Sequence, residues 1–264
     1  MPPSSLTLAA THGLRQLAAR DPDAATLAAA LRHLAKWRAE LVANTIADRM
    51  GTTVQAGPFT GMTYATRASE GSRAARLLGV YEASLAPVIE TIVATAYPLV
   101  IDVGSAEGYY AVGLARRMPA TRVLARDDNP QAQTLCRQLA LQNGVEDRVT
   151  IGGRMDHADF AICTAQPTVL ICDIEGAEET LLDPALAPGL LHADILVECH
   201  DVMRPGLTDL IAARFAASHS VTRLDRQLDA NLPAWTEEWS DLDRLIALWE
   251  WRSGPTPWLW MTRK

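Results

Sequence analysis

Short apolar runs alternate with segments of helical periodicity through the middle of the chain. Residues 84–96 place apolar side chains on one helix face, and Val100, Ile101 and Val103 form a β-branched run typical of a buried strand. Five further strands are predicted, at residues 121–127, 148–151, 168–173, 194–200 and 258–261. Strands that alternate with helices at this interval predict an α/β fold, a mainly parallel sheet covered on both faces.

A helical extension, residues 1–52, is expected to precede this α/β region, residues 53–264. The first 20 residues have the composition of a transit peptide, but Asp21–Pro22 begins a second helical pattern that ends near Gly51. The apolar stripe of that helix is Leu27, Leu31, Leu34, Trp37 and Leu41. We therefore favour a folded extension, which would serve as a substrate cap, as a homodimer contact, or simply as packing against the main domain.

Most of the tryptophans lie near the C-terminus, where residues 230–254 are predicted to form a helical insertion. Trp235, Trp239, Leu242, Ile246 and Trp249 recur at helical spacing. Two interpretations remain open, a lid that offers aromatic surface to a substrate and a stripe buried on the sheet.

A glycine turn follows the first strand and carries the most specific chemical signal. Its pattern is Asp102-x-Gly104-x-x-x-Gly108, whereas a dinucleotide site has G-x-G-x-x-G. An acid two residues before the first glycine would repel a pyrophosphate, but it suits a ligand with an ammonium group. S-adenosylmethionine is such a ligand, and the glycine spacing disfavours a nicotinamide-dependent oxidoreductase.

Acidic residues and a histidine stand at the predicted carboxyl ends of the strands, where ligands bind in such sheets. Asp127 lies where a nucleotide site binds ribose hydroxyls. His200 is the candidate general base, and Glu198 on the same strand face would orient the imidazole or bind the substrate. Asp173 would line the pocket near the methionine moiety.

Other acids near these strand ends have more than one interpretation. Asp156 and His157 are placed to meet an adenine, although a solvated loop is also an option, and Glu175 and Glu178 would cap a helix. The alternative is that four of these residues bind a divalent ion such as magnesium. They are Asp173, Glu198, His200 and Asp201.

Four segments together resemble class I S-adenosylmethionine-dependent methyltransferases, and within them the FkbM-like group. They are Val100–Tyr110, Asp127–Gly144, Asp173–Glu178 and Leu196–Asp201. The resemblance implies a Rossmann-like, doubly wound, mostly parallel sheet of seven strands with helices on both faces. It also implies methyl transfer to a small molecule, most simply to a hydroxyl of a sugar or secondary metabolite. The alternative is a non-catalytic scaffold that binds S-adenosylmethionine.

The candidate residues fall into two groups. Those for the cofactor are Asp102, Gly104, Ser105, Gly108, Tyr109, Asp127, Asp128, Asp156, His157 and Asp173. Those for catalysis are His200, Glu198 and Asp173.

Composition narrows the class of partner. The formal net charge is −7 without a basic run, and Asp173-Ile174-Glu175-Gly176 replaces the D/N-P-P-Y signature of base methyltransferases, so nucleic acid is not expected as substrate. Four scattered cysteines without a C-x-x-C pair are typical of reduced thiols in a cytoplasmic protein. No apolar run has the length of a membrane span, so no membrane partner is expected.

Overall fold

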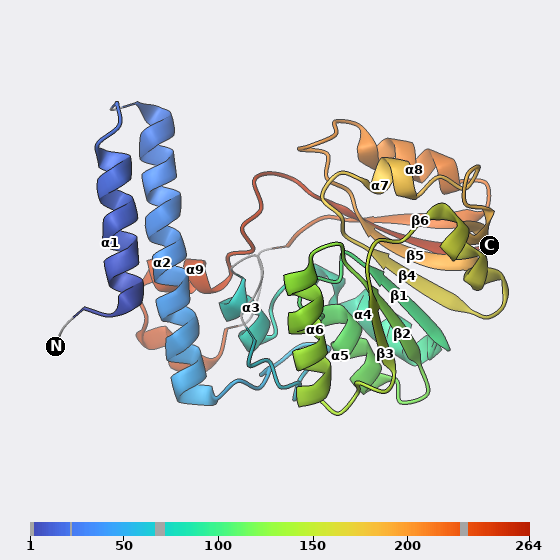
Figure 1. Ribbon diagram of the computed structural model, residues 1–264, viewed down its shortest axis with the longest axis horizontal. Helices are drawn as coiled ribbons and strands as arrows, with labels where there is room; N and C mark the ends of the chain where they lie inside the picture. The colour runs from blue at the N-terminus through green and yellow to red at the C-terminus, as the bar shows by residue number, and fades with distance from the viewer. Residues whose placement is uncertain (1–2, 22, 67–71, 228–231) are drawn as a thin grey trace.

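A seven-stranded sheet forms the centre of the molecule (Figure 1). The computed structural model describes residues 3–21, 23–66, 72–227 and 232–264. The strands are β1 (Leu99–Val103), β2 (Arg122–Arg126), β3 (Val149–Gly152), β4 (Thr168–Cys172), β5 (Ala193–Glu198), β6 (His219–Leu224) and β7 (Trp258–Arg263). Their order is β3-β2-β1-β4-β5-β7-β6, with the first five parallel and β7 antiparallel to both neighbours. The predicted mostly parallel, doubly wound sheet is confirmed, and each strand located from the sequence lies within two residues of its predicted bounds.

Both faces of the sheet are buried because side chains of β1 and β4 alternate between two apolar clusters. Val100 and Val169 face one cluster, and Ile101 and Leu170 face the other. The helices on the first side are α4 (Ala86–Thr95), α5 (Tyr109–Arg117) and α6 (Pro130–Gln142). Those on the second side are the α-helices α7 (Glu178–Leu181) and α8 (Leu207–Phe215) and the 3₁₀ helices η2 (His157–Thr164) and η3 (Pro188–His192).

The strand order reverses between β1 and β4. The chain passes from β1 to β2 on one side, and it later crosses from β3 to β4 on the other side of β1. The loops after β1 and β4 therefore leave in opposite directions, and the crevice between them is the usual ligand site of such sheets.

The N-terminal extension is a helical hairpin that stands beside the sheet domain (Figure 1). It consists of α1 (Ser5–Ala18) and α2 (Ala24–Met50), and Gly51 ends the second helix as predicted. The predicted leucine stripe is wrong, because Leu27 and Leu31 are 68% and 70% exposed. The buried positions of α2 are Ala35, Ala39, Val42, Ala43 and Ile46. Small side chains let this half of α2 approach α3 (Arg73–Leu78) and α9 (Asp241–Ala247) closely.

The Trp-rich segment is two short pieces rather than the single helical insertion predicted for residues 230–254. A 3₁₀ helix, η4 (Ala234–Glu238), ends before Ser240, whose side chain caps α9. Residues 230 and 231 lie outside the described part of the chain. This segment packs on α2, where Arg38 makes a two-pronged hydrogen bond to Asp243 (2.6 Å for each). The extension is thus attached through C-terminal residues.

One stretch, Arg73–Thr95, has the length and apolar composition of a membrane span among the described residues, with 44% of its most apolar window buried. Buried helices in the core of a protein can have the same length and apolar composition, so these two properties are weak evidence for a membrane span. The stretch is also broken into α3, η1 (Ala83–Leu85) and α4, with left-handed backbone at Gly79 and Glu82.

A buried ion pair joins α3 to the loop after β1. Glu107 accepts hydrogen bonds from Arg76 and from the hydroxyl of Tyr64 (2.6 Å for the latter), and all three side chains are buried. Glu107→Gln leaves the Arg76 charge buried beside a neutral group, and we expect a loss of about 3–5 kcal/mol in the free energy of unfolding. Urea denaturation measures this loss.

The matched control is Asp225→Asn, which breaks the exposed Arg223–Asp225 pair and should leave the urea midpoint almost unchanged. Equal midpoint shifts in the two variants would contradict the structural role assigned to Glu107.

Candidate functional site

The turn after β1 needs glycine at two positions. Gly104 and Gly108 have φ of +81° and +93°, which L side chains rarely adopt. A Cβ atom on Gly104 would collide with the backbone carbonyl oxygen of Asp173, and one on Gly108 would lie 2.6 Å from Sγ of Cys136. The turn is therefore wedged between the end of β4 and helix α6.

Asp127 holds this turn from the end of β2. Its carboxylate accepts hydrogen bonds from the backbone N–H of Ala106 (2.9 Å) and of Asn129 (2.8 Å). The backbone carbonyl of Arg126 accepts from the N–H groups of Gly104 (2.8 Å) and Ser105 (3.1 Å). Asn129 then caps α6 through Gln131 N–H, with Pro130 at the first helical position, as the sequence predicts.

A first pocket of about 440 Å³ opens over this turn. Six of the ten residues predicted to bind a cofactor line it: Gly104, Asp127, Asp128, Asp156, His157 and Asp173. Arg126, Arg154 and Met155 also line it. The sequence indicated none of these three, because nothing distinguishes them from ordinary strand and loop residues.

The other four predicted cofactor residues do not line this pocket: Asp102, Ser105, Gly108 and Tyr109. Tyr109 points into an aromatic cluster, edge-on to Phe59 (ring centroids 5.2 Å apart) and to Tyr64 and Tyr81. Its position at the start of α5 turns it toward the core and away from the turn.

Asp102 lies buried beneath the turn. Its side chain is 3% exposed, and its Oδ2 has no hydrogen-bond partner in the described part of the chain. Burial raises the pKa of Asp102 to about 7, and the nearby charges of Asp173 and Asp127 add to the increase. A cation bound close to this carboxyl group would lower its pKa and favour the ionised form.

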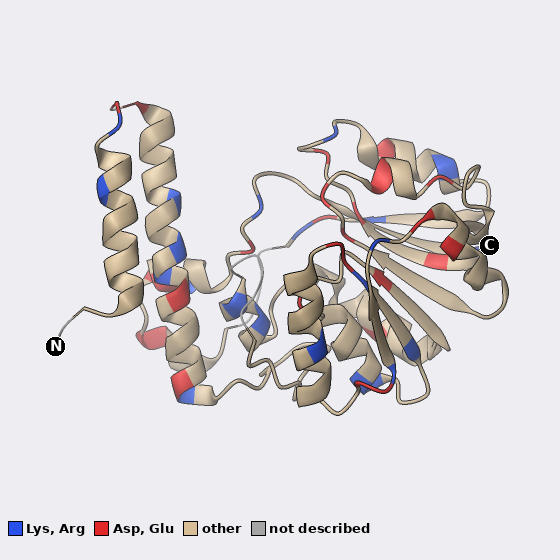
Figure 2. Ribbon diagram, in the orientation of Figure 1, with Lys and Arg blue, Asp and Glu red and all other residues tan. Residues whose placement is uncertain are grey.

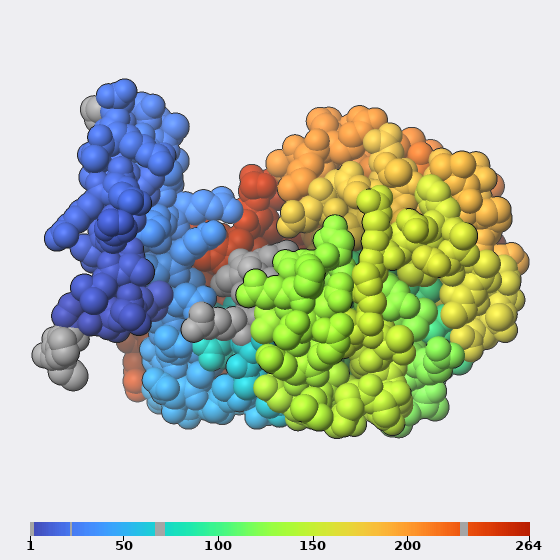
Figure 3. Space-filling view, viewed as in Figure 1, coloured from blue at the N-terminus to red at the C-terminus, as the bar shows by residue number. Residues whose placement is uncertain are grey.

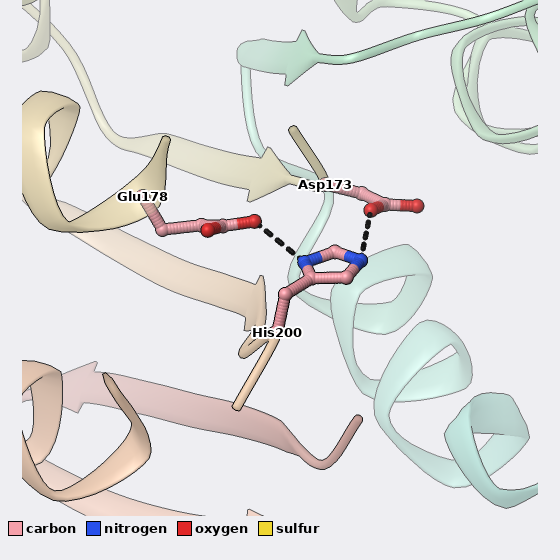
Figure 4. A group of neighbouring side chains, drawn as sticks. All are labelled: Asp173, Glu178 and His200. Carbon is pink, nitrogen blue, oxygen red and sulfur yellow. Dashed lines mark hydrogen bonds and ion pairs between the residues drawn. The ribbon is translucent and has the colours of Figure 1, made fainter. Parts of the chain in front are cut away.

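His200 and Glu178 form a hydrogen-bonded dyad at the end of β5 (Figure 4). Nδ1 of His200 lies 2.7 Å from Oε1 of Glu178, and Nε2 lies 3.5 Å from Oδ1 of Asp173. With Glu178 accepting from Nδ1–H, Nε2 is the nitrogen that exchanges a proton.

Glu178, rather than Glu198, makes the short hydrogen bond to the imidazole. Glu198 lies 3.7 Å from Nε2 of His200 and is ion-paired with Arg252, and its predicted roles, orienting the imidazole or binding the substrate, stay predictions. The sequence predicts a helix-capping role for Glu178, because its separation of 22 residues from His200 gives no signal of their contact.

The pKa of His200 lies above its ordinary value. Burial lowers this pKa, but the hydrogen bond to Glu178 and the charges of Asp173 and Glu175 outweigh that effect. The pKa of Glu178 lies below its ordinary value, because the hydrogen bond to His200 and backbone contacts overcome its burial. The dyad is therefore a base of raised strength supported by a buried carboxylate.

Asp173, Glu178 and His200 are also a candidate metal-ligating group, with ligand atoms within 4.8 Å of one another. Asp201, named in the predicted ligand set, instead accepts hydrogen bonds from the N–H (3.1 Å) and the hydroxyl of Thr208. The Nδ1 atom of His200 is bonded to Oε1 of Glu178, whereas Oε2 of Glu178 is buried without a hydrogen-bond partner among the described residues. Nε2 of His200, Asp173 and this oxygen are therefore the donors that a divalent ion would find, and such an ion stays an alternative for this group.

A second pocket of about 310 Å³ adjoins the first. Asp173 and Glu175 line both pockets, and Glu198 and His200 line the second. Its remaining walls come from distant parts of the chain: Arg32 and Lys36 of α2, Tyr81, Met203, Glu250, Trp251, Arg252, Ser253 and Thr256.

Arg252 fixes the C-terminal wall of the second pocket. It is ion-paired with Glu82, Glu198 and Glu250, the last at 3.1 Å, and its side chain is 12% exposed. Glu250 also pairs with Arg226 (2.9 Å). Burial, together with the charge of Glu82, raises the pKa of Glu250 to about 7. This network holds residues 250–252 against the end of β5.

The chain resembles solved methyltransferase structures at low sequence identity. An O-methyltransferase from Bacillus cereus in complex with S-adenosylhomocysteine is 12% identical, with 86% of this chain and 90% of that chain covered and a TM-score of 0.45. The O-methyltransferase of tomaymycin synthesis from Streptomyces achromogenes, in complex with S-adenosylmethionine, is 12% identical over 86% and 89%, with a TM-score of 0.45. A putative rRNA methylase from Clostridium thermocellum is 15% identical over 68% and 95%, with a TM-score of 0.48.

No family model and no curated protein matches the sequence. The FkbM-like assignment stays a prediction, and similarities this distant carry no conclusion about the substrate.

Gly104→Ala tests the close approach at the turn. A Cβ at a φ of +81° is strained and collides with the Asp173 carbonyl, so we expect the free energy of unfolding to fall by about 2–4 kcal/mol in urea titrations. Gly153→Ala is the matched control, because a Cβ there meets nothing within 4 Å. If Gly104→Ala were as stable as that control, the wedged geometry would be incorrect.

Proposed function

We propose that this protein is an S-adenosylmethionine-dependent methyltransferase that methylates a hydroxyl group of a small molecule. The observation that carries the proposal is the wall that the two pockets share at Asp173 and Glu175, with His200 next to Asp173 in the second pocket. A donor in the first pocket and an acceptor in the second would meet beside Asp173. Methyl transfer requires this arrangement, because donor and nucleophile have to be held in line.

The charge of the first pocket favours a cationic nucleoside over a pyrophosphate coenzyme. Five carboxylates line it: Asp127, Asp128, Asp156, Asp173 and Glu175. Of the two arginines in its wall, Arg126 already donates to the backbone carbonyl of Thr150 (3.1 Å). Asp102 adds a buried carboxyl group beneath the turn, with an oxygen that has no partner among the described residues.

The residues present fit S-adenosylmethionine, which supplies a methyl group on a positively charged sulfur. Asp127 would accept the ribose hydroxyls, since each of its oxygens keeps a lone pair after binding one backbone N–H. Asp173 would face the positive charge of the ligand, and Asp102, which does not line the pocket, would act on that charge from beneath the turn. Asp156 and His157, which line the first pocket, would meet the adenine.

His200 is suited to remove the acceptor's proton. His200 lines the second pocket, and its Nε2 would accept the hydroxyl proton, while Glu178 keeps Nδ1 protonated and stabilises the resulting imidazolium. A positioned base of this kind contributes roughly 10²–10⁴-fold to a rate. The walls formed by Trp251 and Arg252 would limit the access of water.

Calorimetric titration tests the donor, and product formation tests the reaction. S-adenosylmethionine should bind and NAD should not, and release of S-adenosylhomocysteine should require a hydroxylated small molecule rather than an RNA or DNA oligonucleotide. Binding of NAD alone would overturn the proposal. Binding of S-adenosylmethionine without turnover of any acceptor would indicate a non-catalytic binding protein.

His200→Ala and Asp127→Ala should affect different steps. The first removes the base, so turnover should fall about 10²–10⁴-fold with donor affinity almost unchanged. The second removes the carboxylate that shapes the turn, so donor affinity should fall about 10- to 100-fold, as for loss of a hydrogen bond to a charged group. Calorimetry and steady-state kinetics separate the two effects, and full activity in His200→Ala would exclude the base.

The pH–rate profile should report His200. Only the neutral imidazole accepts a proton, so activity falls as the pH drops through the pKa of His200, which lies above that of free imidazole. Glu178→Gln removes the hydrogen-bonding carboxylate that raises this pKa, so the acidic limb should move to lower pH while kcat decreases.

Glu179→Gln is the control for the profile, since the neighbouring Glu179 pairs with Arg204 on the surface. Its acidic limb should coincide with that of the parent protein. A Glu178→Gln profile that kept the parent's limb would contradict the dyad.

A further inference from the structure

Arg32 and Lys36 bring two positive charges from the extension to the second pocket. They stand four residues apart on α2 and therefore on one helix face. The guanidinium carbon of Arg32 lies 5.8 Å, and Nζ of Lys36 5.3 Å, from the centre of the Trp251 ring. Arg32 also donates to the Trp251 carbonyl (3.2 Å). Figure 3 shows the extension beside the sheet domain, with the C-terminal segment visible in the recess between them.

Neither of these two cations has a carboxylate partner within the described ranges of the chain. The third cation of the pocket, Arg252, has three. Figure 2 shows basic positions along α2 and acidic positions in the loops that leave the sheet. The chain is acidic, with a formal net charge of −7, yet these two neighbouring cations at the pocket wall have no carboxylate partner among the described residues. They are therefore available to bind an anion.

The second pocket thus has two chemically different ends. The α2 end carries positive charge over the buried ring of Trp251, and the strand end carries His200 with Asp173, Glu175 and Glu198. The carboxylate of Glu198 is compensated by Arg252, and that of Glu178 by the His200 hydrogen bond. The strand end therefore repels an anion held at the α2 end less than its number of acids suggests.

We propose that the methyl acceptor carries an acidic group, a carboxylate or a phosphate monoester, which Arg32 and Lys36 bind. Its hydroxyl then reaches His200 at the opposite end. This inference rests on the proposed function, and it assigns the N-terminal extension to the acceptor site. A neutral acceptor of the same shape leaves both cations without an anionic partner, so it binds more weakly.

Matched acceptor pairs test this inference. The pairs are 3,4-dihydroxybenzoate with its amide, glucuronate with glucuronamide, and glucose 6-phosphate with glucose, titrated calorimetrically with S-adenosylhomocysteine present. The full-length proteins are the parent, R32Q/K36Q, the charge-preserving R32K/K36R, and the control R20Q/R137Q, which removes two exposed charges away from the pocket. Donor affinity is measured for each.

In the parent, the acid of at least one pair should bind about 10-fold or more tightly than its neutral partner. R32Q/K36Q should lose this preference with donor affinity retained, whereas R32K/K36R and the control should keep it. The carboxylate and phosphate pairs show which acid is bound.

Two results would overturn the inference: no preference for the acid in any pair, or a preference that persists in R32Q/K36Q. Failure of the proposed function is a separate outcome, because it shows as absent binding of S-adenosylmethionine to the parent, whatever the acid preference.

Discussion

The close contact of Gly104 with the carbonyl oxygen of Asp173 is the constraint on which the rest of the site depends. It brings the loops after β1 and β4 together at the point where the strand order reverses. Any side chain at Gly104 would separate these loops, and Asp173 would then no longer lie between the two pockets. Asp127 maintains the contact from the other side by holding the N–H of Ala106. The backbone fixes the position of Asp173, and Asp173 in turn forms part of the wall between the first pocket and His200.

Charged side chains with an oppositely charged partner in the protein stabilise the site itself, whereas those without one are available to bind a ligand. Glu107 is compensated by Arg76, Glu198 by Arg252 and Glu178 by His200. Asp102 keeps a buried oxygen without a partner among the described residues, and its pKa is raised to about 7. A buried carboxyl group in this state is stabilised when a cation arrives. Arg32 and Lys36 are positive groups without a carboxylate partner among the described residues, so an anion would stabilise them. The first pocket would therefore attract a cation, and the α2 end of the second pocket would attract an anion.

The sequence predicted the parts of this architecture that depend on local physics. The glycine turn, the Asn129 cap and the strands of the buried centre are specified by residues within a few positions of one another. Strand β6 was not located, because it is a half-exposed edge strand without a continuous apolar run. The pairing of Glu178 with His200 and the approach of Lys36 to Trp251 join residues far apart in the sequence. The prediction that leucines form the buried face of α2 is wrong, because that face is formed largely by alanines, whose small side chains contribute little to the hydrophobic pattern of the sequence.

The second pocket lies where three segments meet. Helix α2 supplies Arg32 and Lys36, residues 250–256 supply the Trp251 ring and the Arg252 network, and the strand ends supply His200. The bond between Arg38 and Asp243 and the alanine face of α2 fix the first segment on the C-terminal region, and Arg252 fixes that region on β5. The first pocket, in contrast, is built within the sheet domain alone. Under the proposed function, donor binding and acceptor selection would therefore be structurally separable, since changes in the extension would alter the second pocket while the glycine turn stays intact.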